Sequence, residues 1–315
     1  MTNNSSNVNS QDIDGQINGW NRRLLISSIS IWAIFFLISF IGNTWVSILC
    51  CKRLHFLGIK SYYFFSLALA DLIFTLSTLF YVLNIVLPVS IFNNFTCKLF
   101  YYAINTSHGA SVFNLLLLTY NRYVAVMSPL RAFTSQTKSK VRKTLLMTWF
   151  LALFPYSPLF FLYNVNKEKG ESRRQHCSQT SSPFITSLYY ALVTFFMYLM
   201  PLMAIIVAYS KICIRLSCTT NRIGTLGTYR RRKKAIKLLV IIVTLFFILW
   251  TPFNVMLIVI FVFKINFNRL NMAWAFSTLL VLVNASINPW LYLIMSRRTN
   301  GSVKSTPRII KLEKL

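Results

Sequence analysis

Acidic residues are nearly missing from this sequence. Of its 315 residues, 6 are Asp or Glu and 33 are Lys or Arg, and charged residues make up only 12% of the chain. About a quarter of the residues of a soluble domain are charged, so this composition excludes an ordinary soluble enzyme and is typical of a membrane protein. Catalytic patterns are missing too. The three histidines form no acid–base pair and no metal-binding spacing, so we expect no enzyme activity.

Hydrophobic residues, by contrast, make up 55% of the chain and gather in long blocks. Each block is close to or longer than the ~20 residues with which a helix crosses the hydrocarbon of a bilayer. The seven blocks are 24–51, 61–87, 97–127, 143–163, 184–213, 235–263 and 270–295. We therefore predict an all-α membrane protein. Its seven-transmembrane helix bundle covers 24–295, after a polar N-terminal tail over 1–23 and before a short basic tail over 296–315.

The positive charges predict how this bundle is oriented. With the N-terminus outside, 24 of the 33 basic residues fall in cytoplasmic segments, nine of them between Lys211 and Lys237. Membrane proteins carry such an excess of Lys and Arg on the cytoplasmic side, so we expect an extracellular N-terminus and a cytoplasmic tail. Basic residues beside membrane helices meet lipid headgroups. We therefore expect anionic membrane lipid, and no nucleic acid, as the partner of this charge.

The predicted outer side carries features typical of extracellular chains. Asn3, Asn4 and Asn94 each begin a sequon for N-glycosylation. Cys97 and Cys177 both fall outside, where disulfides persist, so we predict a bridge between them. Residues 1–23 contain no apolar stretch typical of a cleaved signal peptide, so the first block is expected to act as its own insertion signal.

One acidic residue lies inside a hydrophobic block. Burying a polar group in hydrocarbon without a partner costs several kcal/mol, so such residues are informative. Asp71 is the only Asp or Glu in any predicted span. Its residue type alone fits either a neutral carboxyl group hydrogen-bonded to a neighbouring helix or a cation site.

Short motifs follow one another through the seven blocks. They are Gly42-Asn43, Leu67-Ala68-Leu69-Ala70-Asp71, Asn121-Arg122-Tyr123, Trp149, Pro201 with Tyr209, Phe246-x-x-x-Trp250-x-Pro252 and Asn288-Pro289-x-x-Tyr292. In this order, and with Cys97 placed 25 residues before Arg122, the chain resembles the rhodopsin-like (class A) G protein-coupled receptors. The resemblance implies a multi-pass plasma-membrane receptor that passes an extracellular signal to a heterotrimeric G protein.

The resemblance also implies roles for single residues. The family's sodium pocket corresponds to Asp71, Ser111, Asn284 and Asn288, whose oxygen atoms suit a hard cation. A sodium ion would act there as an allosteric modulator, and a hydrogen-bonded core without an ion is the alternative. No other cofactor is expected. The residues that match the family's activation switch are Asn121, Arg122, Tyr123, Tyr209, Phe246, Pro252, Pro289 and Tyr292.

The switch departs from the usual family pattern at two positions. Asn121 stands where an Asp is commonest, and Arg232 stands where the sixth helix often supplies an acidic partner. Arg122 is therefore expected to use amide, hydroxyl or water contacts, which are weaker than charge-assisted hydrogen bonds.

Four stretches, 107–116, 123–137, 249–256 and 283–289, look like the biogenic-amine receptors, most of all the muscarinic acetylcholine type. Yet Ile104 replaces the amine-anchoring aspartate of that group. A buried ammonium needs a counter-ion or an aromatic cage, so we expect an altered ligand. The predicted ligand-binding residues are Ile104, Asn105, His108, Trp250, Phe253, Asn254, Thr278 and Leu282.

Such an uncharged cavity suits a neutral or weakly acidic small molecule. A neuropeptide receptor of the same fold is the alternative, because basic residues near the outer face could attract a peptide carboxylate. A membrane transporter is an alternative from another class, although the two halves of the chain show no internal repeat. An opsin is excluded, since the last block contains no lysine to hold retinal.

Overall fold

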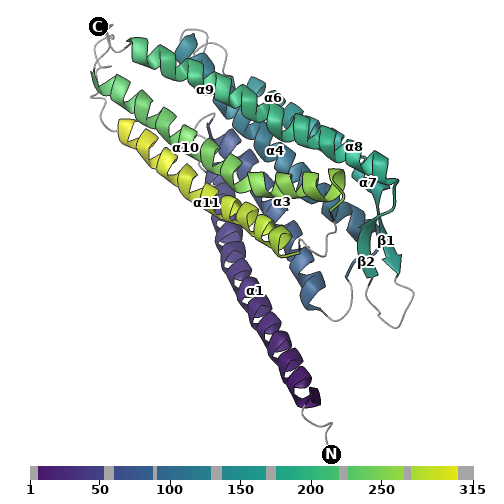
Figure 1. Ribbon diagram of the computed structural model, residues 1–315. Helices are drawn as coiled ribbons and strands as arrows, with labels where there is room; N and C mark the ends of the chain where they lie inside the picture. Colours follow the sequence, from purple (N-terminus) through teal and green to yellow (C-terminus); the bar gives the residue numbers. More distant parts are fainter. Residues whose placement is uncertain are drawn as a thin grey trace, which may run out of the picture.

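The computed structural model describes the backbone of residues 6–52, 60–87, 91–128, 137–167, 175–219, 226–265 and 271–303. Its helices form the seven predicted spans, arranged as one bundle (Figure 1). The spans are α1 (Ser6–Lys52), α3 (Lys60–Val86), α4 (Asn94–Met127), α6 (Lys138–Leu153) with η1 (Phe154–Tyr156) and α7 (Leu159–Leu162), α8 (Pro183–Thr194) with η2 (Phe195–Leu199) and α9 (Met200–Thr219), α10 (Leu226–Leu257) with η3 (Ile258–Val262), and α11 (Asn271–Val303).

Six of the seven spans within the described ranges are long and apolar enough to cross a membrane by composition alone. The exception is α4, which buries a run of polar residues, Asn105, Thr106, Ser107 and His108. This helix packs against α3, α6 and α9, so its neighbours rather than lipid surround it. A helix shielded in this way needs less apolar surface than a helix that faces lipid.

Two spans contain a π-helical turn. In the fifth span, η2 lies directly before Pro201, whose missing N–H interrupts the ordinary helical hydrogen bonds. In the sixth span, η3 follows Leu257, five residues after Pro252. Each turn changes the direction of the outer half of its helix. The outer halves of the fifth and sixth spans are in contact, since α8 packs against η3.

A β-hairpin joins the fourth and fifth spans. We did not predict this hairpin from the sequence. Strands β1 (Tyr163–Lys167) and β2 (Gln175–Gln179) pair antiparallel, with Val165 opposite Cys177. The hairpin lies at the end of the bundle where α4 begins (Figure 1). Tyr163 and Val165 alternate with polar residues in β1, but each strand has only five residues and β2 has Cys177 as its one apolar residue, which is too short a pattern to predict a strand.

The first and last helices run past the predicted domain boundaries. Helix α1 begins at Ser6, inside the tail predicted over 1–23, and extends beyond the bundle in Figure 1. Helix α11 continues without a break to Val303, into the predicted tail over 296–315. Neither boundary therefore coincides with the end of a helix.

The family motifs join neighbouring helices. Gly42 lets α1 approach α11 closely, because a Cβ there would lie 2.9 Å from the Cγ of Pro289. Asn43 on α1 donates to the Ala285 carbonyl of α11 at 3.0 Å. Trp149 on α6 donates to the Ser66 hydroxyl of α3 at 3.1 Å. Each contact satisfies a polar group between two helices, where a bilayer offers no partner.

Candidate functional site

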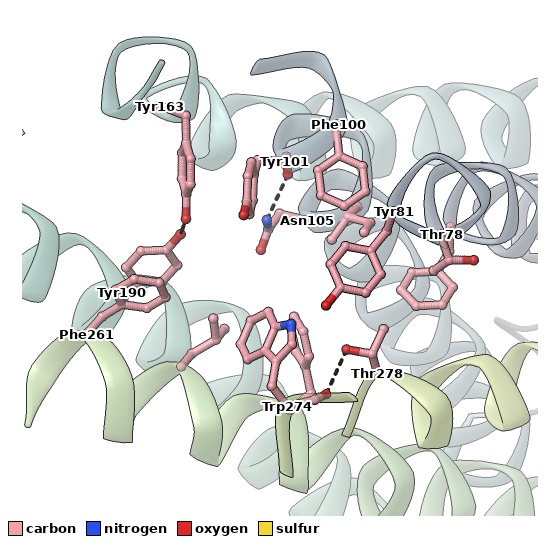
Figure 2. Close-up of a pocket in the computed structure, with 14 residues that line it drawn as sticks. Thr78, Tyr81, Phe100, Tyr101, Asn105, Tyr163, Tyr190, Phe261, Trp274 and Thr278 are labelled. Atoms are coloured by element: carbon pink, nitrogen blue, oxygen red, sulfur yellow. Dashed lines mark hydrogen bonds between the residues drawn. The ribbon is translucent and has the colours of Figure 1, made fainter. Parts of the chain in front are cut away.

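A cavity of about 40 Å³ lies in the outer half of the bundle, with room for a few water molecules. Figure 2 shows its aromatic walls. The lining residues come from α3, α4, β1, α8, α10, η3 and α11. They are Phe74, Thr78, Tyr81, Phe100, Tyr101, Ile104, Asn105, Tyr163, Tyr190, Phe253, Leu257, Phe261, Trp274 and Thr278. Nine of these fourteen side chains are aromatic and none is charged.

The hairpin forms one wall of this cavity. The predicted disulfide joins Cys97 to Cys177, with 5.6 Å between their Cα atoms, and so ties β2 to the first turn of α4. On β1, the ring of Tyr163 stacks on Tyr101 of α4 with 3.7 Å between centroids. The bridge therefore holds an aromatic residue of the hairpin against the helix at the centre of the bundle.

Tyr163 also connects the hairpin to the fifth and sixth spans. Its hydroxyl lies 2.7 Å from the Tyr190 hydroxyl and accepts from Gln179 at 2.9 Å. The Tyr190 ring stacks on Phe261 of η3 with 4.2 Å between centroids. Burial raises the pKa of Tyr163 well above the usual value of a phenol, so this hydroxyl stays neutral.

Four of the eight predicted ligand residues line the cavity, namely Ile104, Asn105, Phe253 and Thr278. The other four, His108, Trp250, Asn254 and Leu282, are buried and do not line it. Their assignment to a ligand stays a prediction. The sequence reasoning missed eight aromatic residues of the lining, at 74, 81, 100, 101, 163, 190, 261 and 274. Tyr101 lies three residues before Ile104 on the same helix face, so this spacing could have indicated it. Nothing in the sequence indicated Tyr163 before the hairpin was known.

His108 and Trp250 form a stacked pair within the bundle core. Their ring centroids lie 4.1 Å apart, and Trp250 also packs on Phe246 and Phe253. The Tyr156 hydroxyl lies 3.5 Å from Nδ1 of His108. Nε2 of His108 and Nε1 of Trp250 have no hydrogen-bond partner in the described part of the chain. The contacts of this pair in the core are therefore mainly between aromatic rings.

The residues of the predicted sodium pocket are all buried. Asn288 donates to Oδ2 of Asp71 at 2.9 Å, which joins α11 to α3. Ser111 and Asn284 make no hydrogen bond to this carboxylate within the described ranges. Ala70 and Ala110, which directly precede Asp71 and Ser111, pack against each other. The structure thus brings α3, α4 and α11 together here without deciding between an ion and a hydrogen-bonded core.

At the cytoplasmic end, the switch residues of α4 and α9 lie together. Arg122 is half-buried and lies close enough to Tyr209 for their side chains to interact electrostatically. Asn121 contacts Tyr63 of α3. Pro252 and Pro289 lie inside α10 and α11 as predicted. The side chains of Tyr292 and Arg232 lie outside the described part of the structure.

Of the three predicted glycosylation sites, one lies among the residues that the structure describes. Asn3 and Asn4 lie outside the described residues. Asn94 is exposed at the start of α4, where its side-chain oxygen accepts from the Val165 N–H of β1 at 3.0 Å. Thr96 of its sequon forms a capping box with Asn93.

Comparison with known proteins then identifies the chain. Residues 42–292 match the family described as "7 transmembrane receptor (rhodopsin family)". The chain belongs to this receptor family. It is therefore a multi-pass plasma-membrane receptor with an extracellular N-terminus, it signals from an extracellular ligand to a G protein, and it is not an enzyme.

Curated relatives of the receptor carry two kinds of name. "Probable C-C chemokine receptor type 3" from Mus musculus is 25% identical over 280 residues, which cover 85% of this chain and 75% of the relative. "Growth hormone secretagogue receptor type 1" from Oryctolagus cuniculus and from Mustela putorius furo is 29% identical over 229 residues. That alignment covers 67% of this chain and 61% of each relative, so less than two thirds of their length is spanned.

A hydrogen-bonded contact holds the fifth span of the receptor against the sixth. The Tyr198 hydroxyl, on η2, donates to the Phe247 carbonyl at 3.1 Å and lies 2.6 Å from the Thr251 hydroxyl. Thr251 also donates to the Phe247 carbonyl at 2.6 Å. The contact lies directly before Pro252, where α10 lacks a backbone donor. Tyr198 therefore stabilises α10 next to the position where Pro252 removes a backbone hydrogen bond.

We expect Tyr198→Phe to lower the stability of the receptor by about 1 kcal/mol, because one buried hydrogen bond between helices is lost while the ring still packs. The measurement is the melting temperature of the purified receptor. Tyr120→Phe is the matched control, since the Tyr120 side chain is 58% exposed. Equal melting of Tyr198→Phe and wild type would contradict the role of the hydroxyl.

Proposed function

We propose that the receptor responds to a peptide or small protein whose end group enters the cavity of Figure 2, and not to a cationic amine. The observation that carries this proposal is the uncharged lining of the cavity. Ile104 lies where the amine receptors have an anchoring aspartate, and none of the fourteen lining residues is acidic. A desolvated ammonium would find no counter-ion among them, which costs far more than one neutral hydrogen bond returns.

Two further observations support a peptide. The relatives are named for a chemokine, which is a small protein, and for a growth hormone secretagogue. The hairpin contributes Tyr163 to the cavity wall, and most other residues of its two strands are polar, which suits a ligand chain that carries amide groups along its length. The likeness of four stretches to muscarinic receptors stays a prediction about the subgroup, and it concerns residues at and below the floor of the cavity.

The ligand class is tested by screening cells that express the receptor with amidated peptides, chemokines, growth hormone secretagogues and biogenic amines, with G protein activation as the readout. We expect a peptide or chemokine to activate. Its potency should fall about tenfold or more in Tyr163→Ala, since a buried aromatic contact at the centre of an interface is lost.

Phe161→Ala is the matched control, because Phe161 lies two residues away and is 82% exposed. Surface expression of each variant is measured with an N-terminal tag. Activation by amines together with silence of every peptide would overturn the proposal and favour the amine-like reading.

We also propose that a sodium ion binds beside Asp71 as an allosteric modulator. Asp71 and Asn288 supply oxygen atoms of the kind that sodium prefers, and Ser111 and Asn284 are buried on the facing helices. Two other buried oxygens, Oδ1 of Asn43 and Oδ1 of Asn114, have no donor within the described ranges. Asn43 contacts Ala285, the neighbour of Asn284. Unused acceptor oxygens of this kind favour a bound cation or ordered water.

Sodium binding predicts that the purified receptor melts at a higher temperature in sodium chloride than in potassium chloride of equal concentration, since an ion that binds only the folded state stabilises it. Asp71→Asn should remove the difference, and Ser77→Ala on the same helix should keep it. The same melting temperature of the wild type in both salts would instead favour a hydrogen-bonded core without an ion.

The cytoplasmic charge is proposed to contact anionic lipid as well as the G protein. Lys52, Lys138, Lys140, Arg142 and Lys143 are exposed at the ends of α1 and α6 that face the cytoplasm. Each basic residue at this depth contributes about 1 kcal/mol of attraction to an anionic leaflet. No nucleic-acid partner is proposed.

A further inference from the structure

The geometry points to an uncharged carboxamide as the ligand group that occupies the cavity of Figure 2, held by Tyr81, Tyr101 and Asn105. This inference rests on the proposed function in taking the cavity as the ligand site, and it adds the chemistry of the group that enters. A peptide with an amidated C-terminus, or with an Asn or Gln near its end, carries such a group.

Three polar groups of the cavity wall are available to a ligand. The hydroxyls of Tyr81 and Tyr101 make no hydrogen bond to any described residue, and Figure 2 shows both directed toward the space between the side chains. Asn105 donates through its nitrogen to the Tyr101 carbonyl at 2.8 Å, which fixes the orientation of its amide. The oxygen of that amide then faces the cavity without a described donor.

Each of the remaining hydroxyls of the wall already makes at least one hydrogen bond. Tyr163 and Tyr190 lie 2.7 Å apart and bond to each other. Thr78 donates to the Thr75 carbonyl at 2.8 Å, and Thr278 donates to the Trp274 carbonyl at 3.0 Å. The polar groups of the wall that make no described hydrogen bond are therefore two phenols, which donate or accept, and one amide oxygen, which only accepts.

A carboxamide matches this set. Its oxygen accepts from a tyrosine hydroxyl, while its N–H groups donate to the oxygen of Asn105. A carboxylate has no donor for the oxygen of Asn105. An ammonium can donate to that oxygen and to the phenols, but it offers no acceptor to their O–H groups, so it uses the phenols only as acceptors. Either ion would also lose its hydration in a cavity that offers no opposite charge. The cavity of about 40 Å³ admits a small group of this kind with little rearrangement of the walls.

The test compares four small probes of similar shape on the purified full-length receptor in nanodiscs, with binding followed by saturation-transfer NMR. The probes are phenylacetamide, 1-phenylpropan-2-one, phenylacetate and 2-phenylethylammonium. The ketone keeps the acceptor oxygen of the amide but has no N–H donor. We expect phenylacetamide to bind more tightly than each of the other three.

Variants assign that binding to the three side chains. Tyr81→Phe and Tyr101→Phe should each weaken phenylacetamide binding about three- to tenfold, the effect of one lost hydrogen bond. Tyr189→Phe is the matched control, because the Tyr189 hydroxyl donates to the Pro155 carbonyl at 3.2 Å and does not line the cavity. Asn105→Leu should reduce phenylacetamide to the affinity of the ketone. Melting temperatures establish that each variant is folded.

Three results would overturn the inference: a charged probe that binds as tightly as the amide, no binding by any probe, or unchanged binding in both tyrosine variants. These failures differ from failure of the proposed function. A peptide that activates through Tyr163 while the amide probe fails leaves the function in place and removes the carboxamide. Binding of the amide through Tyr81 and Tyr101 supports the carboxamide even when every peptide in the screen is silent.

Discussion

Hydrocarbon supplies no hydrogen-bond partner, and this constraint decides where each polar side chain of the receptor lies. It forces the backbone into helices and turns the polar residues of the spans toward one another. Asn43 reaches α11, Trp149 reaches α3 and Asn288 reaches Asp71, so polar pairs join helices that are far apart in sequence. The same constraint explains α4, whose polar run is tolerated because other helices surround it.

On the outer side a disulfide bond shapes one wall of the cavity. The disulfide of Cys97 ties the hairpin to α4, and Tyr163 then lies against Tyr101 and Tyr190. Through Tyr190 and Phe261 the hairpin is also in contact with the outer half of the sixth span. Under the proposed function, a ligand that moves Tyr163 would therefore act on α4 and on the sixth span at once.

Much of this architecture could be predicted from the sequence. Helix length, charge asymmetry and ordered motifs predicted the seven spans, their orientation and the disulfide, because these depend on composition and spacing along one chain. The hairpin was missed because its strands have five residues each and β2 has a single apolar residue, so the pattern is too short to separate them from a loop. Four of the eight predicted ligand residues do not line the cavity, and their contact with a ligand stays a prediction. Helical spacing placed His108 and Leu282 on inward faces, but only packing decides at which depth a cavity ends.

The account of ligand binding depends on how far the cavity extends into the bundle. The reactivity of cysteines introduced along α11 measures this depth directly. A membrane-impermeant thiol reagent applied to intact cells does not meet Cys50, Cys51 and Cys213, the free cysteines among the described residues, or Cys218, because all four belong to predicted cytoplasmic helix ends. Thr278→Cys, in the cavity wall, should react with it, whereas Leu282→Cys, one turn deeper and fully buried, should not. Equal reactivity at both positions, or reaction at 282 alone, would contradict the account.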